Sequence, residues 1–249
     1  MIHPKDLIYS KDFIMTLEKL QHYMNLYYDG KITKNIELFF LKNPEYTQKY
    51  KEISREINLP IDDDFQYTVG YYFENARKHK FYILILDHDV PDSYIIMTLF
   101  HELSHIETFP VSSWHYIKKK TKKHSLLGLQ FWTEYIAEYE ATNQYQMKVK
   151  IMNVLQNKQL LDSHMNHILD LARDCGIGVL YEYVLLYEIN NCKIDCIHEE
   201  MMDLIKSLKN LKQQFISRED MKKITVTQLN ALGVNINNLQ NRLIEQKML

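Results

Sequence analysis

The segment HELSH, residues 101–105, holds the side chains of this sequence best suited to chemistry. His101 and His105 are four residues apart, and on an α-helix this spacing places both imidazoles on one face, one turn apart. Two imidazoles so placed can bind one metal ion, and Glu102 can reach a water molecule on that metal. The segment predicts a zinc site with Glu102 as general base. The alternative is a core helix that carries these residues by chance, since the chain has 11 His.

Catalytic zinc usually takes three protein ligands plus water, so a further ligand is expected from another helix. The segment FWTEYIAEYEA, residues 131–141, offers three glutamates. Glu134 and Glu138 share a face one turn apart, whereas Glu140 points elsewhere. With Glu134 on the metal, Glu138 can accept a hydrogen bond from a ligand histidine, which fixes its tautomer. With Glu138 on the metal, the residue one turn later is Thr142, a poorer partner, so Glu134 is the favoured third ligand.

The elements before HELSH must position it. Apolar residues from Ser10 recur at helical spacing and predict a helix that ends at Asp29-Gly30. A second helix is predicted from about Lys34 to Ile57. The aromatic and β-branched segments 66–73 and 80–88 predict two strands that form a hairpin, the second buried on both faces.

The rest of the pattern is helical. A helix that opens at residues 91–93 and contains HELSH is expected to end before Phe109-Pro110. A long helix is predicted from Leu126 past Lys150, followed by about four further helices with breaks near Cys175-Gly176, Asn191-Cys192 and Gly233. With 46% hydrophobic residues, 6 Gly and 5 Pro in 249 residues, the sequence predicts an α+β protein that is predominantly α-helical.

Charge and cysteine content limit the partners and the compartment. The net charge of -2 gives no argument for nucleic acid or an acidic membrane surface as a partner. The N-terminus lacks the pattern of a signal peptide, and the most apolar later run, residues 176–190, is short and broken by two glutamates. An odd number of cysteines, three, suits a reducing compartment. The prediction is a cytoplasmic protein with no membrane partner, and the sequence leaves its oligomeric state open.

Three further segments could be functional, but a structural interpretation is favoured for each of them. The basic run KKKTKKH, residues 118–124, lacks interleaved aromatic residues and is read as a solvated loop. Cys192, Cys196 and His198 offer three potential metal ligands at a non-standard spacing. Residues 225–246 match the outline of a helix-turn-helix with a turn at Gly233, but the second helix offers a single arginine for phosphate contacts. A packed helical hairpin is the favoured reading there.

HELSH, followed about thirty residues later by Glu134-Tyr-Ile-Ala-Glu138, resembles the glutamate-zincin metallopeptidases, and within them most of all the ImmA/IrrE-type family. The resemblance covers roughly residues 65–145. Two positions depart from the family pattern: Ser104 stands where that family usually has Gly, and Thr142 follows the glutamate helix motif where it usually has Asn.

The resemblance implies a zincin-like metallopeptidase domain over residues 1–150, with a helical C-terminal extension over 151–249 packed on it. It implies a zinc-dependent hydrolase that cleaves a peptide bond in a protein or peptide substrate, such as a repressor-like regulatory protein. A second oxyanion donor is common in such sites, and the tyrosines and histidines that could serve are Tyr181, Tyr183, His164 and His167. The alternative is a non-enzymatic regulator on a zincin scaffold that binds protein or DNA through its C-terminal helices.

Overall fold

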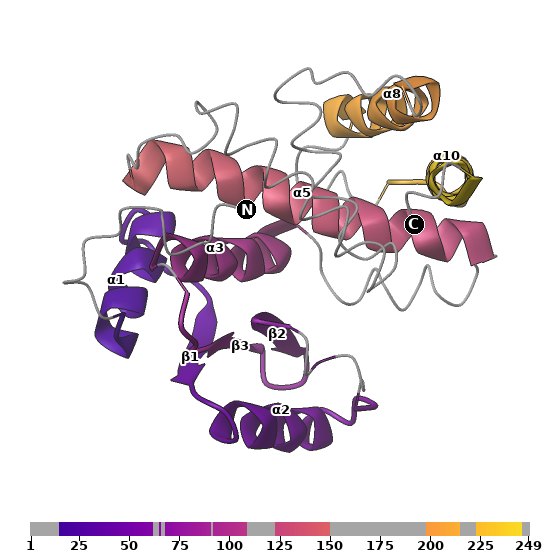
Figure 1. The fold of residues 1–249 in the computed structure, drawn as a ribbon. Helices are drawn as coiled ribbons and strands as arrows, with labels where there is room; N and C mark the ends of the chain where they lie inside the picture. The colour runs from indigo at the N-terminus through magenta and orange to yellow at the C-terminus, as the bar shows by residue number, and fades with distance from the viewer. Residues whose placement is uncertain are drawn as a thin grey trace. The chain divides into compact units, whose positions relative to one another are not determined.

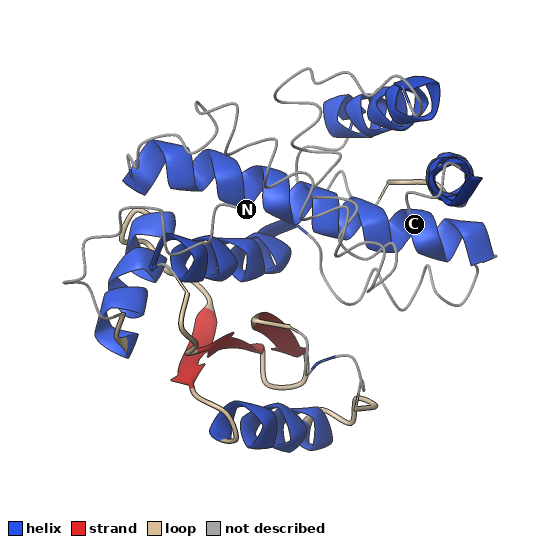
Figure 2. Ribbon diagram, in the orientation of Figure 1, coloured by secondary structure: helices blue, strands red, loops and turns tan. Residues whose placement is uncertain are grey.

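The computed structural model describes residues 15–61, 65, 68–90, 92–108, 123–149, 198–214 and 223–245. Within these residues the protein is mostly helical, with six helices and one small sheet of three strands. Figure 2 colours the helices blue and the strands red. The α+β, predominantly helical class predicted from the sequence is confirmed. No helix of the described part is long and apolar enough to cross a bilayer.

The chain divides into two compact units. The first comprises Met1–Ile106 and Gln144–Val149, and the second comprises Glu107–Asn143 and Lys150–Leu249. Two helices, α3 (Asp92–Thr108) and α5 (Lys123–Val149), each contain residues of both units. The boundary at residue 150 that the sequence predicts remains a prediction.

Helix α1 (Leu17–Tyr27) opens the described part of the first unit. Thr16 caps it, because its side-chain oxygen accepts a hydrogen bond from the backbone N–H of Lys19 at 3.3 Å. The helix ends at the predicted place. Asp29 and Gly30 both have positive φ, 51° and 73°, a conformation that ends helices and that glycine adopts without steric cost.

The sheet has the strand order β1-β3-β2, with β1 at Asn35–Leu41, β2 at Gly70–Asn75 and β3 at Lys80–Leu86. Strands β2 and β3 pair antiparallel, so the predicted hairpin is confirmed. Strand β1 pairs with β3 in parallel, which makes β3 the central strand. Its residues Tyr82–Ile85 are all buried, as the prediction of two covered faces required.

The helix predicted from about Lys34 to Ile57 is wrong in its first half. Those residues form β1 and, after the Asn43-Pro44 peptide, helix α2 (Glu45–Glu56). The residue before a proline is disfavoured in the α conformation, and the run NIELFFL is rich in residues that strands favour. Its partner β3 lies about 45 residues later in the chain, so periodicity within the segment did not reveal the pairing.

Helices cover both faces of the sheet, with α2 on one side and α1 and α3 on the other (Figure 1). On the α2 side, aromatic rings from the helix and the strands form one buried cluster: Tyr46, Tyr50, Ile53, Phe65, Phe73, Tyr82 and Leu84. Tyr50 stacks on Phe65 with ring centroids 4.0 Å apart. On the α3 side, Tyr72 of β2 stacks on His105. Successive residues of β2 therefore serve different faces, as the period of two requires.

The second unit contains α5 as far as Asn143, together with α8 (His198–Gln214) and α10 (Val226–Glu245). The long helix predicted from Leu126 is confirmed as α5. The predicted turn at Gly233 is wrong, because α10 continues through that residue, so neither a helix-turn-helix nor a hairpin forms there. A helical glycine costs only about 1 kcal/mol relative to alanine, which the packing of a long helix offsets.

Several sequence predictions fall outside the described residues. These are the breaks near Cys175-Gly176 and Asn191-Cys192, the cysteines of the possible second metal site, the four possible oxyanion donors and most of the KKKTKKH run.

Candidate metal centre

Helix α3 carries HELSH and ends at Thr108, directly before Phe109-Pro110, as predicted. Most of its apolar residues are buried, and Leu99, Phe100 and Leu103 each have 0% exposure. Two charged or titratable side chains lie among them: Glu102 has 7% exposure and His105 has 6%. Burying such groups costs free energy unless they have polar partners, so both side chains are expected to make polar contacts.

The two histidines lie side by side. Their Nε2 atoms are 3.0 Å apart, and their ring centroids are separated by 4.7 Å with the planes at 77°. Two nitrogen ligands of tetrahedral zinc stand roughly 3.3 Å apart, given Zn–N distances of about 2.0–2.1 Å. Two helical positions one turn apart have therefore placed both imidazole nitrogens at a spacing that one zinc ion can use.

Glu134 completes the set. Among the described residues, His101, His105 and Glu134 form a group that could hold a metal ion, each offering one ligand atom, with these atoms all within 4.8 Å of one another. Two imidazoles and one carboxylate are a donor set that catalytic zinc sites use. Neither Glu138 nor Glu140 belongs to this group. The group contains Glu134, the glutamate that the sequence favoured over Glu138, and metal binding by it remains a prediction.

The periodicity of α5 agrees with this register. Tyr145 lies eleven residues after Glu134, close to three turns, so the two side chains lie on the same stripe of the helix. Tyr145 contacts Phe100, the residue before His101, with ring centroids 6.2 Å apart. Tyr145, which contacts α3, thus shares its stripe of α5 with Glu134.

Glu140 has a different environment. Its pKa is raised, mainly because burial penalises the charged carboxylate, while the ammonium group of Lys212 opposes that shift. Lys212 also lies over the ring of Tyr139, 4.0 Å from its centroid. Glu140 thus belongs to the packing of α8 against α5, which agrees with the prediction that it points away from the metal ligands.

The carboxylate of Glu102 lies under the first residue of β2. A Cβ placed on Gly70 would meet Oε1 of Glu102 at 2.7 Å and Cγ2 of Thr98 at 2.5 Å. The Glu102 charge also contributes to raising the pKa of Tyr46 to about 12, after the larger effect of burial. Glu102 is therefore a buried carboxylate with little room around it, next to the histidine pair in sequence.

Ser104 explains one departure from the zincin pattern. It is fully buried, and its hydroxyl donates to the carbonyl oxygen of Phe100 at 2.8 Å. The hydroxyl of Tyr27 lies 3.0 Å from the same Oγ and therefore acts as the donor to it. Tyr27 also packs edge-on against Phe100, at 5.2 Å between centroids. A serine in place of glycine gives α1 a polar attachment to α3 beside His105.

Sequence reasoning missed three residues around this centre: Gly70, Tyr72 and Tyr27. No sequence signal marks Tyr27, which lies 77 residues from its partner Ser104. A glycine and a tyrosine two residues apart in a predicted strand indicate only that both face the same side. Which helix they face depends on the packing of the hairpin, and the pattern does not contain that information.

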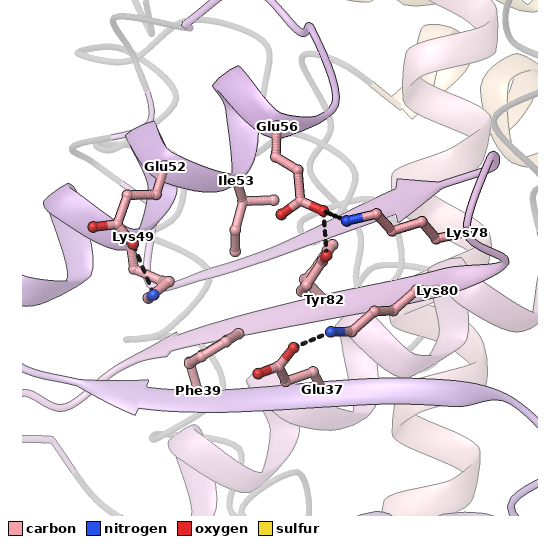
Figure 3. A pocket seen from close by; sticks show the side chains of 9 residues that line it. All are labelled: Glu37, Phe39, Lys49, Glu52, Ile53, Glu56, Lys78, Lys80 and Tyr82. Carbon is pink, nitrogen blue, oxygen red and sulfur yellow. Dashed lines mark hydrogen bonds and ion pairs between the residues drawn. The ribbon is translucent and has the colours of Figure 1, made fainter.

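A hollow of about 290 Å³ lies elsewhere in the first unit, on the α2 side of the sheet (Figure 3). Its charged side chains are matched within it: Lys80 with Glu37, Lys78 with Glu56 at 2.7 Å, and Lys49 with Glu52 at 2.7 Å. Glu56 also accepts a hydrogen bond from the Tyr82 hydroxyl at 2.9 Å. This arrangement attaches α2 to the strands, and it brings no His or Cys together.

No protein-family model, curated protein or solved structure matches this chain. The comparisons therefore supply neither a family nor an activity, and any function must be argued from the residues themselves.

Proposed function

We propose that the protein is a zinc-dependent metallopeptidase in which His101, His105 and Glu134 bind the metal and Glu102 is the general base. One observation carries the proposal: the ligand atoms of these three residues, which the sequence predicted as ligands, lie within 4.8 Å of one another. A zinc ion held there would polarise a substrate carbonyl and lower the pKa of water. The zincin-like character of the core is part of this proposal.

Glu102 is suited to moving a proton. It adjoins the first metal ligand, and its burial at 7% exposure keeps bulk water from screening its charge. The carboxylate would accept a proton from the attacking water and release it to the nitrogen of the departing amine. Both transfers occur at the same carboxylate, so the residue ends the reaction in the state in which it began.

A peptide is the substrate class that the surroundings favour. Strand β2 lies at one edge of the sheet and at the same time lies against α3, through Gly70 and Tyr72. An edge strand can pair with an extended peptide through its backbone groups. By the resemblance of HELSH and Glu134, the target would be a regulatory protein in the cytoplasm, such as a repressor.

The first experiment is metal content by plasma mass spectrometry on untagged protein, beside single alanine variants. We expect about one zinc per chain in the parent, lost in His101→Ala and in Glu134→Ala. Glu140→Ala is the matched control, because it removes a glutamate from the same helix outside the ligand group. Absence of zinc from the parent, even after zinc is supplied, would mean that HELSH is part of an ordinary core helix and not of a metal site.

A second experiment separates metal binding from hydrolysis. Glu102→Gln keeps the shape of the side chain and all three ligands, so we expect it to retain zinc. Cleavage of a peptide library, followed by mass spectrometry of new termini, should fall by a factor of about 10²–10⁴ because the general base is lost. Zinc without cleavage in the parent protein would favour the non-enzymatic regulator instead.

A further inference from the structure

Strand β2 and helix α3 meet through matched residues. Gly70 and Tyr72 are two residues apart and so lie on the same side of the strand. Their contacts on α3 are Glu102 and His105, which are three residues apart and so lie on neighbouring turns. Gly70 therefore lies beside the carboxylate of Glu102, and Tyr72 lies beside the imidazole of His105.

The position of Gly70 leaves no room for a side chain. An added Cβ would meet Thr98 Cγ2 at 2.5 Å, Glu102 Oε1 at 2.7 Å and Glu102 Cγ at 3.1 Å. Thr98 cannot rotate away without losing the hydrogen bond from its hydroxyl to the carbonyl oxygen of Tyr94, at 2.9 Å. Glu102 has more rotatable side-chain bonds than Thr98, so a methyl group at residue 70 would displace its carboxylate.

Tyr72 holds the second contact. Its ring stacks on the imidazole of His105 with centroids 5.0 Å apart and planes within 13° of parallel. The stack covers a face of the imidazole, while Nε2 at the ring edge lies 3.0 Å from Nε2 of His101. A parallel ring on one face restricts rotation of the imidazole about its Cβ–Cγ bond, and this rotation sets the direction of the Nε2 lone pair.

We propose that β2 positions the catalytic machinery of α3: Tyr72 orients His105 toward the metal, and Gly70 preserves the space that the Glu102 carboxylate occupies. This inference rests on the proposed function and adds two positioning residues to it. The strand thereby couples the substrate-facing edge of the sheet to the geometry of the metal site.

Tyr72 is tested by zinc affinity, measured in competition with a chelator, and by the visible spectrum of the Co²⁺-loaded protein. Loss of an outer partner of a metal ligand typically costs roughly 10–100-fold in affinity, so Tyr72→Leu should weaken zinc by at least about tenfold and alter the Co²⁺ spectrum. Tyr72→Phe keeps the ring and should restore both. Tyr71→Leu is the matched control, since Tyr71 is the neighbouring tyrosine and contacts Tyr50 on the α2 side.

Gly70 is tested by Gly70→Ala, which should keep one zinc per chain and an unchanged Co²⁺ spectrum. Cleavage of the peptide library should fall about 100-fold, as expected for a catalytic group displaced by about 1 Å. Adding Thr98→Ser removes one of the two clashes while keeping the hydroxyl, and should recover part of the lost activity. Gly30→Ala is the control for a glycine-to-alanine change without a clash, because a Cβ there meets nothing within 4 Å.

The outcomes separate this inference from the proposed function. Equal zinc affinity in the Tyr71→Leu and Tyr72→Leu variants would overturn the role of Tyr72 while leaving the metal site intact. Full cleavage by Gly70→Ala, or a loss of zinc with its loss of activity, would overturn the role of Gly70. A parent protein without zinc would overturn the proposed function itself, and this inference with it.

Discussion

Neighbouring residues of β2 lead into two different environments. Tyr71 and Phe73 pack against Tyr50 in the aromatic cluster under α2. Gly70 and Tyr72 lie against two of the α3 residues that the proposed chemistry uses, Glu102 and His105. On the α2 side the charged side chains that line the hollow form ion pairs with one another. On the α3 side charged or titratable side chains are buried.

The difference shows how one small sheet can serve stability and chemistry at once. Apolar contact on the α2 side supplies free energy of folding without geometric demands beyond close packing. The α3 side accepts buried polar groups, which are costly, and must hold them in fixed positions. Variants on the two sides should therefore fail in different ways, and the following predictions test that separation.

The largest change in stability is expected from Tyr50→Ala. Tyr50 has 1% exposure and contacts three other rings of the cluster, so its truncation should cost about 3–5 kcal/mol of unfolding free energy. The measurement is urea denaturation followed by circular dichroism. Tyr50→Leu, a milder change, keeps the protein folded for the zinc assay and should retain one zinc per chain. A folded Tyr50→Leu protein without zinc would show that the two sides are not separable.

A smaller loss is expected from Ser104→Ala on the α3 side. The substitution leaves the buried Tyr27 hydroxyl without its acceptor, which costs about 1–3 kcal/mol. Adding Tyr27→Phe removes the stranded hydroxyl, so the double variant should be no less stable than Ser104→Ala alone. Denaturation of the three variants forms a thermodynamic cycle. Strict additivity of the two single losses would show that the hydrogen bond does not couple α1 to α3.

The stability of the protein should depend on pH through Glu56, one of the residues that line the hollow on the α2 side. Hydrogen bonds from Lys78, and then from Tyr82, hold the pKa of Glu56 below its ordinary value of 4.5. A carboxylate with a depressed folded-state pKa stabilises the protein above its ordinary pKa, and that contribution is lost as the pH falls through the depressed value. Glu56→Gln should therefore be less stable than the parent near neutral pH, and the difference should shrink in acid.

Urea denaturation of both proteins across the acid range measures this difference. A gap between parent and Glu56→Gln that stays constant from neutral to strongly acid pH would contradict the assignment of the stabilisation to the ionised carboxylate.

The smallest effect is expected from Lys49→Gln. Its partner Glu52 is one turn away on α2, and the two side chains are 33% and 44% exposed. Exposed pairs of this kind contribute little, because water and salt screen them and both side chains lose freedom. The denaturation midpoint should match that of the parent within error. A clear loss would mean that Lys49 stabilises the protein through its position over the ring of Phe39 in β1, 5.1 Å from the centroid, and not through its pair with Glu52.

The sequence was most informative where chemistry depends on local spacing. The pair His101 and His105 was predicted from helical spacing, and the hairpin of β2 and β3 from residue type and the polar residues between the strands. Metal binding by this pair and Glu134 remains a prediction. Strand β1 was misread as a helix, because its partner β3 lies far along the chain and a short apolar run suits either structure. The contacts of Gly70 and Tyr27 depend on how distant elements pack, and no local pattern encodes them.

The order of the strands also has a kinetic consequence. Strands β2 and β3 are neighbours in sequence and lead directly into α3, so residues 70–105 can form a hairpin and its helix through short loops. Hairpins of this kind close in roughly 1–10 μs, whereas the parallel pairing of β1 with β3 must first close a much longer loop. We therefore expect the strand and helix that carry Gly70, Tyr72, Glu102 and His105 to associate early in folding, with β1 and α2 joining afterwards.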